Sequence, residues 1–343
     1  MIMVSKTAKV GGLETRLFEI RNEEEFSSVA LEVFHFQYTN NPLYQHFCNL
    51  VNRHPGNVLT TAQIPFLPIS FFKSQRVQTT LFVPEEVFKS SGTTGMESSQ
   101  HAVRKRALYE KSFFSTFELM YGDPAHFCFL ALLPSYLERG DSSLVFMVQG
   151  LMDKSRHRLN NFYLHNLASL SEAITELEEQ GQSTILIGVT YALLDFAARH
   201  PCSLRHTIVI ETGGMKGRKK ELVRPEVHQI LADAFDLPSV HSEYGMTELL
   251  SQAYARGVGR FETPPWMKAL LRSEDDPMNL EPVMNKPASG TLNIIDLANL
   301  YSCSFIATED AGRLYPDGTF EVLGRMDYSD IRGCSLMAPG REL

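Results

Sequence analysis

The sequence predicts an α/β fold: a large N-terminal domain with parallel β-sheets flanked by helices, followed by a small β subdomain. Apolar runs at 184–189 and 206–211 read as buried strands, and the segment 191–200 between them has a helical pattern. Strands separated by helices are typical of βαβ units, whose strands are parallel. After Gly290 the pattern changes to short strand-like runs with turn residues. A chain of 343 residues with 43% hydrophobic residues allows a sizeable core.

Each element follows from local pattern. Residues 1–60 are expected to form partly amphipathic helices, and the proline-rich segment 61–75 a packed loop. The remaining expected elements, in order, are a β-rich approach at 80–90, helix 104–121, strand 127–133, helix 142–152, a helix over LSEAITELEEQ capped by Ser169 and Glu172, strand 184–189, helix 191–200, strand 206–211, helix 216–235, strand 239–242, and the runs GTLNIID, CSFIAT and RLYPDGTFEVLG. The expected domains are 1–324, with 290–324 as the β subdomain, and 325–343 as a hinge and truncated C-terminal tail.

Composition excludes several function classes. The net charge of −8 and the pI near 5.8 argue against a nucleic-acid partner, which favours a basic face. The five cysteines are scattered without a CxxC pair, so neither a disulfide framework nor a zinc site is expected. No apolar run approaches the roughly 20 residues of a membrane helix, and the N-terminus lacks the apolar core of a signal peptide. These features predict a cytoplasmic protein.

The strongest local signal is the run Ser90-Ser91-Gly92-Thr93-Thr94-Gly95. Glycines let backbone N–H groups converge on an anion, and the hydroxyls add further donors. The run therefore predicts a phosphate-binding loop without the lysine of a Walker motif. A plain surface loop has the same composition, so this motif alone leaves both interpretations open.

A second signal is the run Tyr244-Gly245-Met246-Thr247-Glu248 after an expected strand. A tyrosine ring can stack on a purine, and a glutamate beside a phosphate site can hold Mg²⁺ through oxygen. The alternative is a strand-to-helix turn whose glutamate favours the helix dipole.

A third signal combines Thr308-Glu309-Asp310 with Gly324-Arg325-Met326-Asp327 further along. The carboxylate of Asp310 can accept both hydroxyls of a ribose, and Arg325 can contact the same nucleotide. The intervening Pro316-Asp317-Gly318 is interpreted as a hairpin turn only.

Taken in this order, the three motifs resemble the adenylate-forming superfamily of acyl-CoA synthetases, peptide-synthetase adenylation domains and luciferases. The resemblance spans roughly residues 80–335 and implies ATP-dependent, AMP-forming activation of a carboxylic acid, with a fatty acid as the expected substrate and Mg²⁺ as cofactor. The site residues it implies are Ser90, Ser91, Gly92, Thr93, Thr94 and Gly95 for the phosphates, Gly213, Gly214 and Tyr244 for adenine, Asp310 for ribose, Arg325 for the nucleotide, Thr247 for the α-phosphate or the carboxylate, and Glu248 for Mg²⁺.

Within the superfamily, the chain looks like the LuxE-type acyl-protein synthetases, because IPFLPISFFKS precedes the loop and no Pro-Lys follows it. The C-terminal domain of the superfamily is expected to be reduced to a stub, so its catalytic lysine has no counterpart at the usual place. Lys73, Arg104 and Lys105 lie on either side of the loop, and none of them can be assigned as a substitute. The resemblance implies that Cys334 carries the acyl group as a thioester, although a half-buried structural cysteine is the alternative.

Two other functions remain open. The chain can load coenzyme A or an acyl carrier protein with help from another chain, or it can be a non-catalytic nucleotide-binding subunit. The partner protein that the resemblance implies is an acyl-CoA reductase-like protein or an acyl carrier protein. The aromatic residues Phe113, Phe114 and Phe117 have helical spacing and are interpreted as core, not as an acyl pocket.

Overall fold

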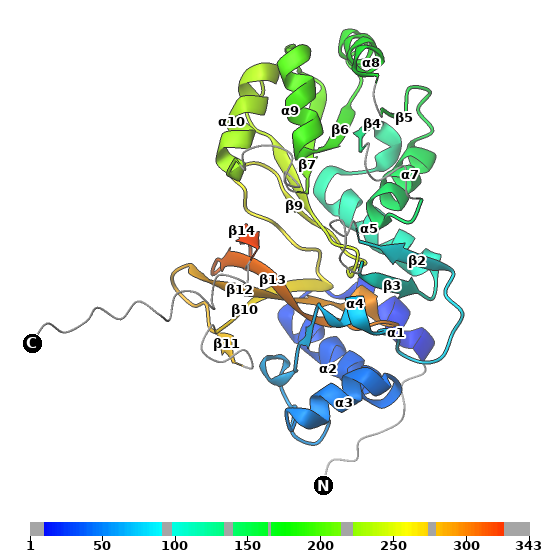
Figure 1. Cartoon of the computed structure of the whole chain (residues 1–343), viewed down its shortest axis with the longest axis vertical. Coiled ribbons are helices and arrows are strands. Elements are labelled where there is room, and N and C mark those ends of the chain that lie inside the picture. Colours follow the sequence, from blue (N-terminus) through cyan, green and yellow to red (C-terminus); the bar gives the residue numbers. More distant parts are fainter. Residues whose placement is uncertain are drawn as a thin grey trace, which may run out of the picture.

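The chain is an α/β protein built on two six-stranded sheets, as a computed structural model shows for residues 10–90, 98–133, 140–163, 166–213, 222–273 and 279–325 (Figure 1). Helices cover both sheets. A separate antiparallel pair, β2 (Glu86–Lys89) and β3 (Gln100–Val103), follows β1 and precedes β4 in the chain. The predicted α/β class with parallel strands flanked by helices is confirmed.

The first sheet has the strand order β5-β4-β6-β7-β8-β9, and all neighbours are parallel except β8 and β9. Its strands β4 and β6 are buried along their whole length, which explains their continuous apolar sequences. In Figure 1, α9 and α10 lie on one side of this sheet, and α5 and α7 on the other. The bounds are β4 (Cys128–Leu132), β5 (Asn161–Phe162), β6 (Thr184–Val189), β7 (Thr207–Thr212), β8 (His241–Tyr244), β9 (Ala253–Ala255), α5 (Arg106–Tyr121), α7 (Ser143–Ser155), α8 (Leu167–Glu179), α9 (Thr190–Arg199) and α10 (Arg224–Phe235).

The second sheet is mostly antiparallel, in the order β1-β13-β12-β10-β11, with β14 also paired to β13. The short strands predicted after Gly290 are present as β12, β13 and β14, in one sheet with strands from earlier in the chain. The division of the chain into domains stays a prediction. The bounds are β1 (Leu67–Pro68), β10 (Met267–Arg272), β11 (Leu280–Glu281), β12 (Ala288–Asp296), β13 (Phe305–Leu314) and β14 (Phe320–Arg325).

The N-terminal helices pack against this second sheet. They are α1 (Val10–Arg16), α2 (Glu23–Asn40) and α3 (Pro42–Leu50). The buried Gln37 side chain donates to the carbonyl of Asn299 at 2.9 Å and accepts from the backbone N–H of Ser304 at 2.9 Å. Phe34 contacts Phe305 edge to face, with ring centroids 6.4 Å apart. The helices expected over 1–60 are therefore part of the main core.

Buried aromatic side chains fill the core around the first sheet. Phe113 and Phe117 on α5 are fully buried. The ring centroid of Phe113 lies 5.1 Å from that of Tyr109, and the ring centroid of Phe117 lies 5.4 Å from that of Phe129. Phe114 is partly buried and packs against the same core. The interpretation of this cluster as core is confirmed.

Three local predictions were wrong. Helix α8 begins earlier than expected: Asn166 caps it by accepting from the N–H of Ser169 at 3.0 Å, so Ser169 lies inside the helix and cannot cap it. Helix α10 begins at Arg224, because Val223 is extended and Pro225 stands in the first turn, so the helix expected over 216–235 is not continuous; residues 216–221 lie outside the described residues. The segment 61–75 contains β1 and the short helix α4 (Phe71–Ser74) besides loop. Within the described residues, no helix combines the length and the apolar character needed to cross a bilayer.

Candidate functional site

The first part of the candidate site lies where β7 and β8 end. These strands are parallel neighbours, and Thr212 is paired with Glu243. Gly213 directly follows β7, and Tyr244 ends β8, so both lie at the carboxyl edge of the sheet, where ligands bind in open α/β sheets. Gly213 has φ +70°, a conformation that favours glycine. Its predicted companion Gly214 lies outside the described residues.

The second sheet supplies Asp310 and Arg325. The two are directly opposite each other on β13 and β14, with Arg325 Nε 3.5 Å from Asp310 Oδ1. The Tyr244 hydroxyl donates to Asp310 Oδ2 at 2.9 Å, which joins the two sheets at this point. The Tyr244 ring packs against Phe261 and Phe320, with centroids 5.7 and 5.3 Å away.

Asp310 is a nearly buried carboxylate beside an exposed cation. Burial raises the pKa of Asp310, while the Arg325 guanidinium and the Tyr244 hydroxyl oppose this rise. The Arg325 side chain is 76% exposed, so it remains accessible to a ligand. A neutral polyol with two adjacent hydroxyls, or an anion beside Arg325, fits this arrangement.

The run after Tyr244 forms a turn that leads to β9 and does not begin a helix. Leu249 N–H donates to the carbonyl of Met246 at 3.0 Å. Glu248 in this turn is 5% exposed, and Asn299 Nδ2 donates to its carbonyl at 2.7 Å. Burial raises the pKa of the Glu248 carboxyl, whereas a hydrogen bond from Ser99 and the charges of Arg325 and Lys73 lower it. Glu248 therefore lies near Arg325 from the second sheet.

The ends of the hydroxyl-rich loop are fixed beside Glu248. Ser90 and Ser99 exchange hydrogen bonds: Ser90 N–H donates to the Ser99 carbonyl at 3.0 Å, and Ser99 N–H donates to Ser90 Oγ at 2.9 Å. The Ser99 side chain is also hydrogen-bonded to the Glu248 carboxyl. The predicted phosphate-binding residues 91–95 lie outside the described residues, and they connect these two ends.

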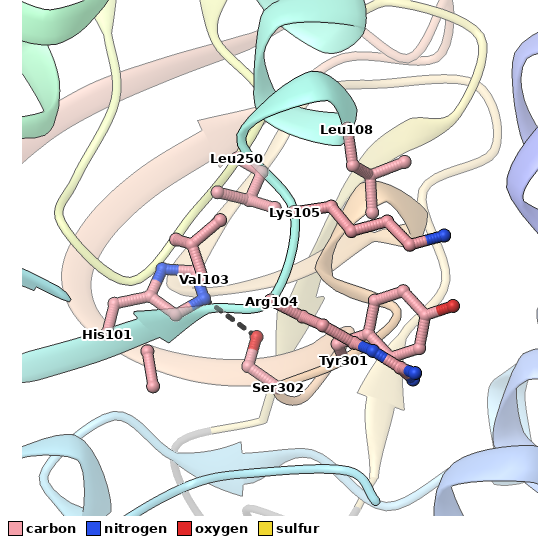
Figure 2. Close-up of a pocket in the computed structure, with 9 residues that line it drawn as sticks. His101, Val103, Arg104, Lys105, Leu108, Leu250, Tyr301 and Ser302 are labelled. Carbon is pink, nitrogen blue, oxygen red and sulfur yellow. Dashed lines mark hydrogen bonds between the residues drawn. The ribbon is translucent and has the colours of Figure 1, made fainter. Parts of the chain in front are cut away.

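His101 is a residue of this site that sequence reasoning missed. Its Nδ1 is 2.8 Å from the carbonyl of Thr247. Its Nε2 is 2.8 Å from Ser302 Oγ, the contact that Figure 2 marks with a dashed line. A carbonyl only accepts, so the hydrogen bonds assign the proton to Nδ1 and the acceptor role to Nε2. Burial lowers the pKa of His101 to about 4, which keeps the ring neutral. No local pattern marked this histidine, because its partners are 146 and 201 positions away.

Arg104 and Lys105 have other partners. The Arg104 guanidinium lies 4.5 Å from the Tyr301 ring centroid, and Lys105 Nζ is 2.7 Å from Glu14 Oε1. Both charged groups point toward Tyr301 and away from His101 (Figure 2). The cavity that these residues line together with His101 and Ser302 has a volume of about 10 Å³, which is room for roughly one water. This cavity is therefore too small for a nucleotide.

A buried polar cluster supports the turn at Gly213. The Thr190 hydroxyl lies within hydrogen-bond distance of two acceptors, Glu211 Oε2 at 2.9 Å and the carbonyl of Gly213, and donates its one proton to either of them. Arg224 Nε lies 3.1 Å from Glu211 Oε1. Beside them, burial raises the pKa of Glu243 to about 7; a hydrogen bond from Thr212 lowers it, and the Glu211 charge raises it further.

The donor set fits Mg²⁺ held mainly by a substrate. Among the described residues, no group of three or more His, Cys, Asp or Glu side chains is placed to hold a metal. Mg²⁺ is commonly bound by one or two carboxylates together with substrate phosphates and waters. The single carboxylate of Glu248, next to the ends of the predicted phosphate loop, matches that pattern.

The predicted acyl carrier Cys334 lies outside the described residues. Of the described cysteines, Cys48, Cys128 and Cys303 are buried and Cys202 is partly exposed. Burial raises the pKa of Cys48 to about 12 and that of Cys128 to about 12, so these two thiols are poor nucleophiles at neutral pH.

Comparisons with known proteins return similar structures only. No protein-family model matches the chain, and no curated protein matches it. Among solved structures, the chain is similar to a luciferase-like enzyme from the nonluminescent mealworm Zophobas morio (15% identity, TM-score 0.47, 73% of this chain and 60% of that one). It is also similar to a long-chain-fatty-acid–CoA ligase from Archaeoglobus fulgidus (14%, 0.48, 71% and 52%) and to an O-succinylbenzoate coenzyme A synthetase from Bacillus subtilis in complex with AMP (16%, 0.46, 71% and 49%). The chain thus spans about half to three fifths of the length of these proteins.

Proposed function

We propose that this protein activates a carboxylic acid with ATP, forming an acyl-adenylate and pyrophosphate, and then transfers the acyl group to a thiol. One observation carries the proposal. Three motifs far apart in the sequence meet at one place: Tyr244 and Glu248 at the carboxyl edge of the parallel sheet, Asp310 and Arg325 on the second sheet, and the fixed ends of the hydroxyl-rich loop.

In the proposed complex, the ribose hydroxyls of ATP donate to Asp310, whose position is set by Tyr244 and Arg325. Adenine lies between the Gly213 turn and Tyr244, and the phosphates lie against the loop 90–95. Thr247 donates to the α-phosphate or to the carboxylate. The acid and the α-phosphorus are held in line, so that positioning and charge neutralisation supply most of the catalysis.

Glu248 is the residue that would hold Mg²⁺, which neutralises phosphate charge when bound. Burial raises the pKa of this carboxyl, and the hydrogen bond from Ser99 and the nearby cations oppose that rise; a bound Mg²⁺ would favour the charged carboxylate further. The LuxE-like sequence features support a fatty acid as substrate and a cysteine thiol as acceptor, and Cys334 is the cysteine proposed for that role. Both the fatty acid substrate and the transfer to a cysteine, as in LuxE-type acyl-protein synthetases, are part of this proposal.

The test is acid-dependent exchange of labelled pyrophosphate into ATP, measured with a panel of acids of about two to eighteen carbons. Chain length is varied because each CH₂ that the site buries strengthens binding by about 0.8 kcal/mol. Asp310→Ala should raise the KM for ATP by about 10- to 100-fold, because a hydrogen bond to a charged group contributes about 1.5–3 kcal/mol. Asp317→Ala on the same hairpin is the matched control, since its side chain bonds only within its turn and to Arg260 among the described residues. Exchange that is absent with every acid would refute the proposed activity, and an unchanged KM in Asp310→Ala would refute the role of Asp310.

A further inference from the structure

The short helix α4 is fixed between β13, the strand that carries Asp310, and His101. The strand before it, β1, pairs in parallel with β13, with Pro68 opposite Ala307. The next residue, Ile69, donates its N–H to the carbonyl of Ala307 at 2.9 Å. Ala307 is three positions before Asp310, roughly 10 Å along the strand, so the start of α4 is attached to the strand that carries the proposed ribose-binding carboxylate. Figure 1 shows α4 beside β13.

The other side of α4 is fixed to the turn that contains Glu248. Phe72 is buried, and its ring meets the His101 ring edge to face at 5.7 Å. His101 in turn donates to the carbonyl of Thr247, the residue before Glu248. The position after Phe72 is therefore defined by packing on one side and by strand pairing on the other.

Lys73 occupies that position. Its ammonium group is close enough to Glu248 to favour the charged form of that carboxyl. Lys73 is exposed, and among the described residues its ammonium group has no hydrogen bond and no ion pair within 4.0 Å. Two other cations near the loop have partners elsewhere, Lys105 in Glu14 and Arg104 in the Tyr301 ring, and Arg325 lies beside Asp310, where it would contact the ribose end of the nucleotide.

We propose that Lys73 is a catalytic residue of this site, whose ammonium group contacts the α-phosphate of ATP and the incoming carboxylate as the acyl-adenylate forms. This inference rests on the proposed function. The site gathers the carboxylates Glu248 and Asp310 where a triphosphate and a substrate carboxylate must also bind. A compact cation that is not committed to another side chain offsets this repulsion.

In the step itself, a carboxylate oxygen of the acid attacks the α-phosphorus and forms a new P–O bond. The bond between the α-phosphorus and the oxygen bridging to the β-phosphorus breaks, and pyrophosphate leaves with that electron pair. No proton is transferred. The Lys73 ammonium keeps its charge throughout and acts by stabilising the negative charge that the α-phosphate carries in the transition state.

The experiment compares Lys73→Met and Lys73→Arg with the wild type in pyrophosphate exchange, with Lys111→Met as the control for loss of an exposed lysine. Binding of ATP with Mg²⁺ is measured separately by calorimetry. We expect Lys73→Met to lower the exchange kcat by about 100-fold or more, the usual effect of removing one transition-state contact, and to change the Kd for ATP by less than about tenfold. Lys73→Arg should retain part of the activity, and Lys111→Met all of it.

Exchange by Lys73→Met within about fivefold of the wild type would overturn the inference and leave the proposed function standing. So would a fall in ATP affinity that accounts for the whole loss, because Lys73 would then be a binding residue only. A wild type that exchanges with no acid refutes the proposed function itself, and the role of Lys73 falls with it. Because Lys73 is exposed, its replacement leaves the core intact, which the near-UV circular dichroism of each variant checks.

Discussion

Replacing Glu243 by glutamine should remove a large pH dependence from the stability of this protein. Glu243 is buried beneath the site, and burial raises its pKa from an ordinary 4.5 to about 7, with the Glu211 charge raising it further. The shift of two to three pK units corresponds to about 3 kcal/mol, at 1.36 kcal/mol for each unit. The Glu243 carboxyl is closely packed against the backbone of Gly245, since a Cβ added at Gly245 would lie 2.4 Å from Glu243 Oε1.

The sign follows from linkage. Because the pKa is raised in the folded state, the stability due to neutral Glu243 is fully present below about pH 4.5. It declines as the pH rises and is lost once the pH passes about 7. Glutamine keeps an oxygen that accepts from Thr212 and never ionises. Three tyrosines also face Glu243, and they stay neutral in this range because burial raises their pKa values above 10 (Tyr109, Tyr121 and Tyr254).

The assay is urea unfolding of the wild type and of Glu243→Gln at several values between pH 4.5 and 8.5, a range set by the pKa limits above. The free energy of unfolding of the variant minus that of the wild type should rise by about 3 kcal/mol between pH 4.5 and 7 and stay level above that. Glu118→Gln, at an exposed position of α5, controls for the loss of one carboxyl. A difference that does not change between pH 4.5 and 7 would refute the assignment of a raised pKa to Glu243.

Two further substitutions test how the site is supported. His101→Ala leaves the carbonyl of Thr247 and the Ser302 hydroxyl without their partner, so we expect a loss of about 1–3 kcal/mol in urea unfolding, together with a lower exchange kcat; a variant as stable as the wild type would contradict this. Gly312→Ala places a Cβ 2.7 Å from the backbone oxygen of Glu321 and 2.6 Å from Leu292 Cγ, so β13 and β14 must separate, at a cost of about 1–3 kcal/mol; an unchanged midpoint of unfolding would show that the hairpin absorbs the methyl group.

Much of the first sheet was predictable because its strands are buried on both faces. The run 184–189 was predicted with the bounds that β6 has, since every one of its residues is buried and the sequence has no polar interruption. Helix starts were less predictable. Asn166 and Ser169 are both good capping residues, and local sequence alone does not decide between them.

The residues that hold the site together were beyond local pattern. The motif residues were found because small, hydroxyl and acidic residues cluster within a few positions. His101 belongs to no such cluster, because it donates to Thr247 from 146 positions away. Lys73, proposed above as a catalytic residue, follows a strand that joins the second sheet only because β1 pairs with β13. Such contacts are set by the packing of sheets and helices, which single-sequence patterns do not encode.

Tyr244 shows why the fold and the candidate site depend on each other. Its backbone ends β8 in the first sheet, its ring packs against Phe261 and Phe320, and its hydroxyl donates to Asp310 on the second sheet. Burial, together with the Asp310 charge, raises the Tyr244 pKa well above 10, so the hydroxyl remains a donor. The position of the Asp310 carboxylate is thus determined by the packing of the two sheets against each other. A ligand that binds at Asp310 and at the Gly213 turn together must therefore stabilise that packing, because it binds only when both sheets are in place.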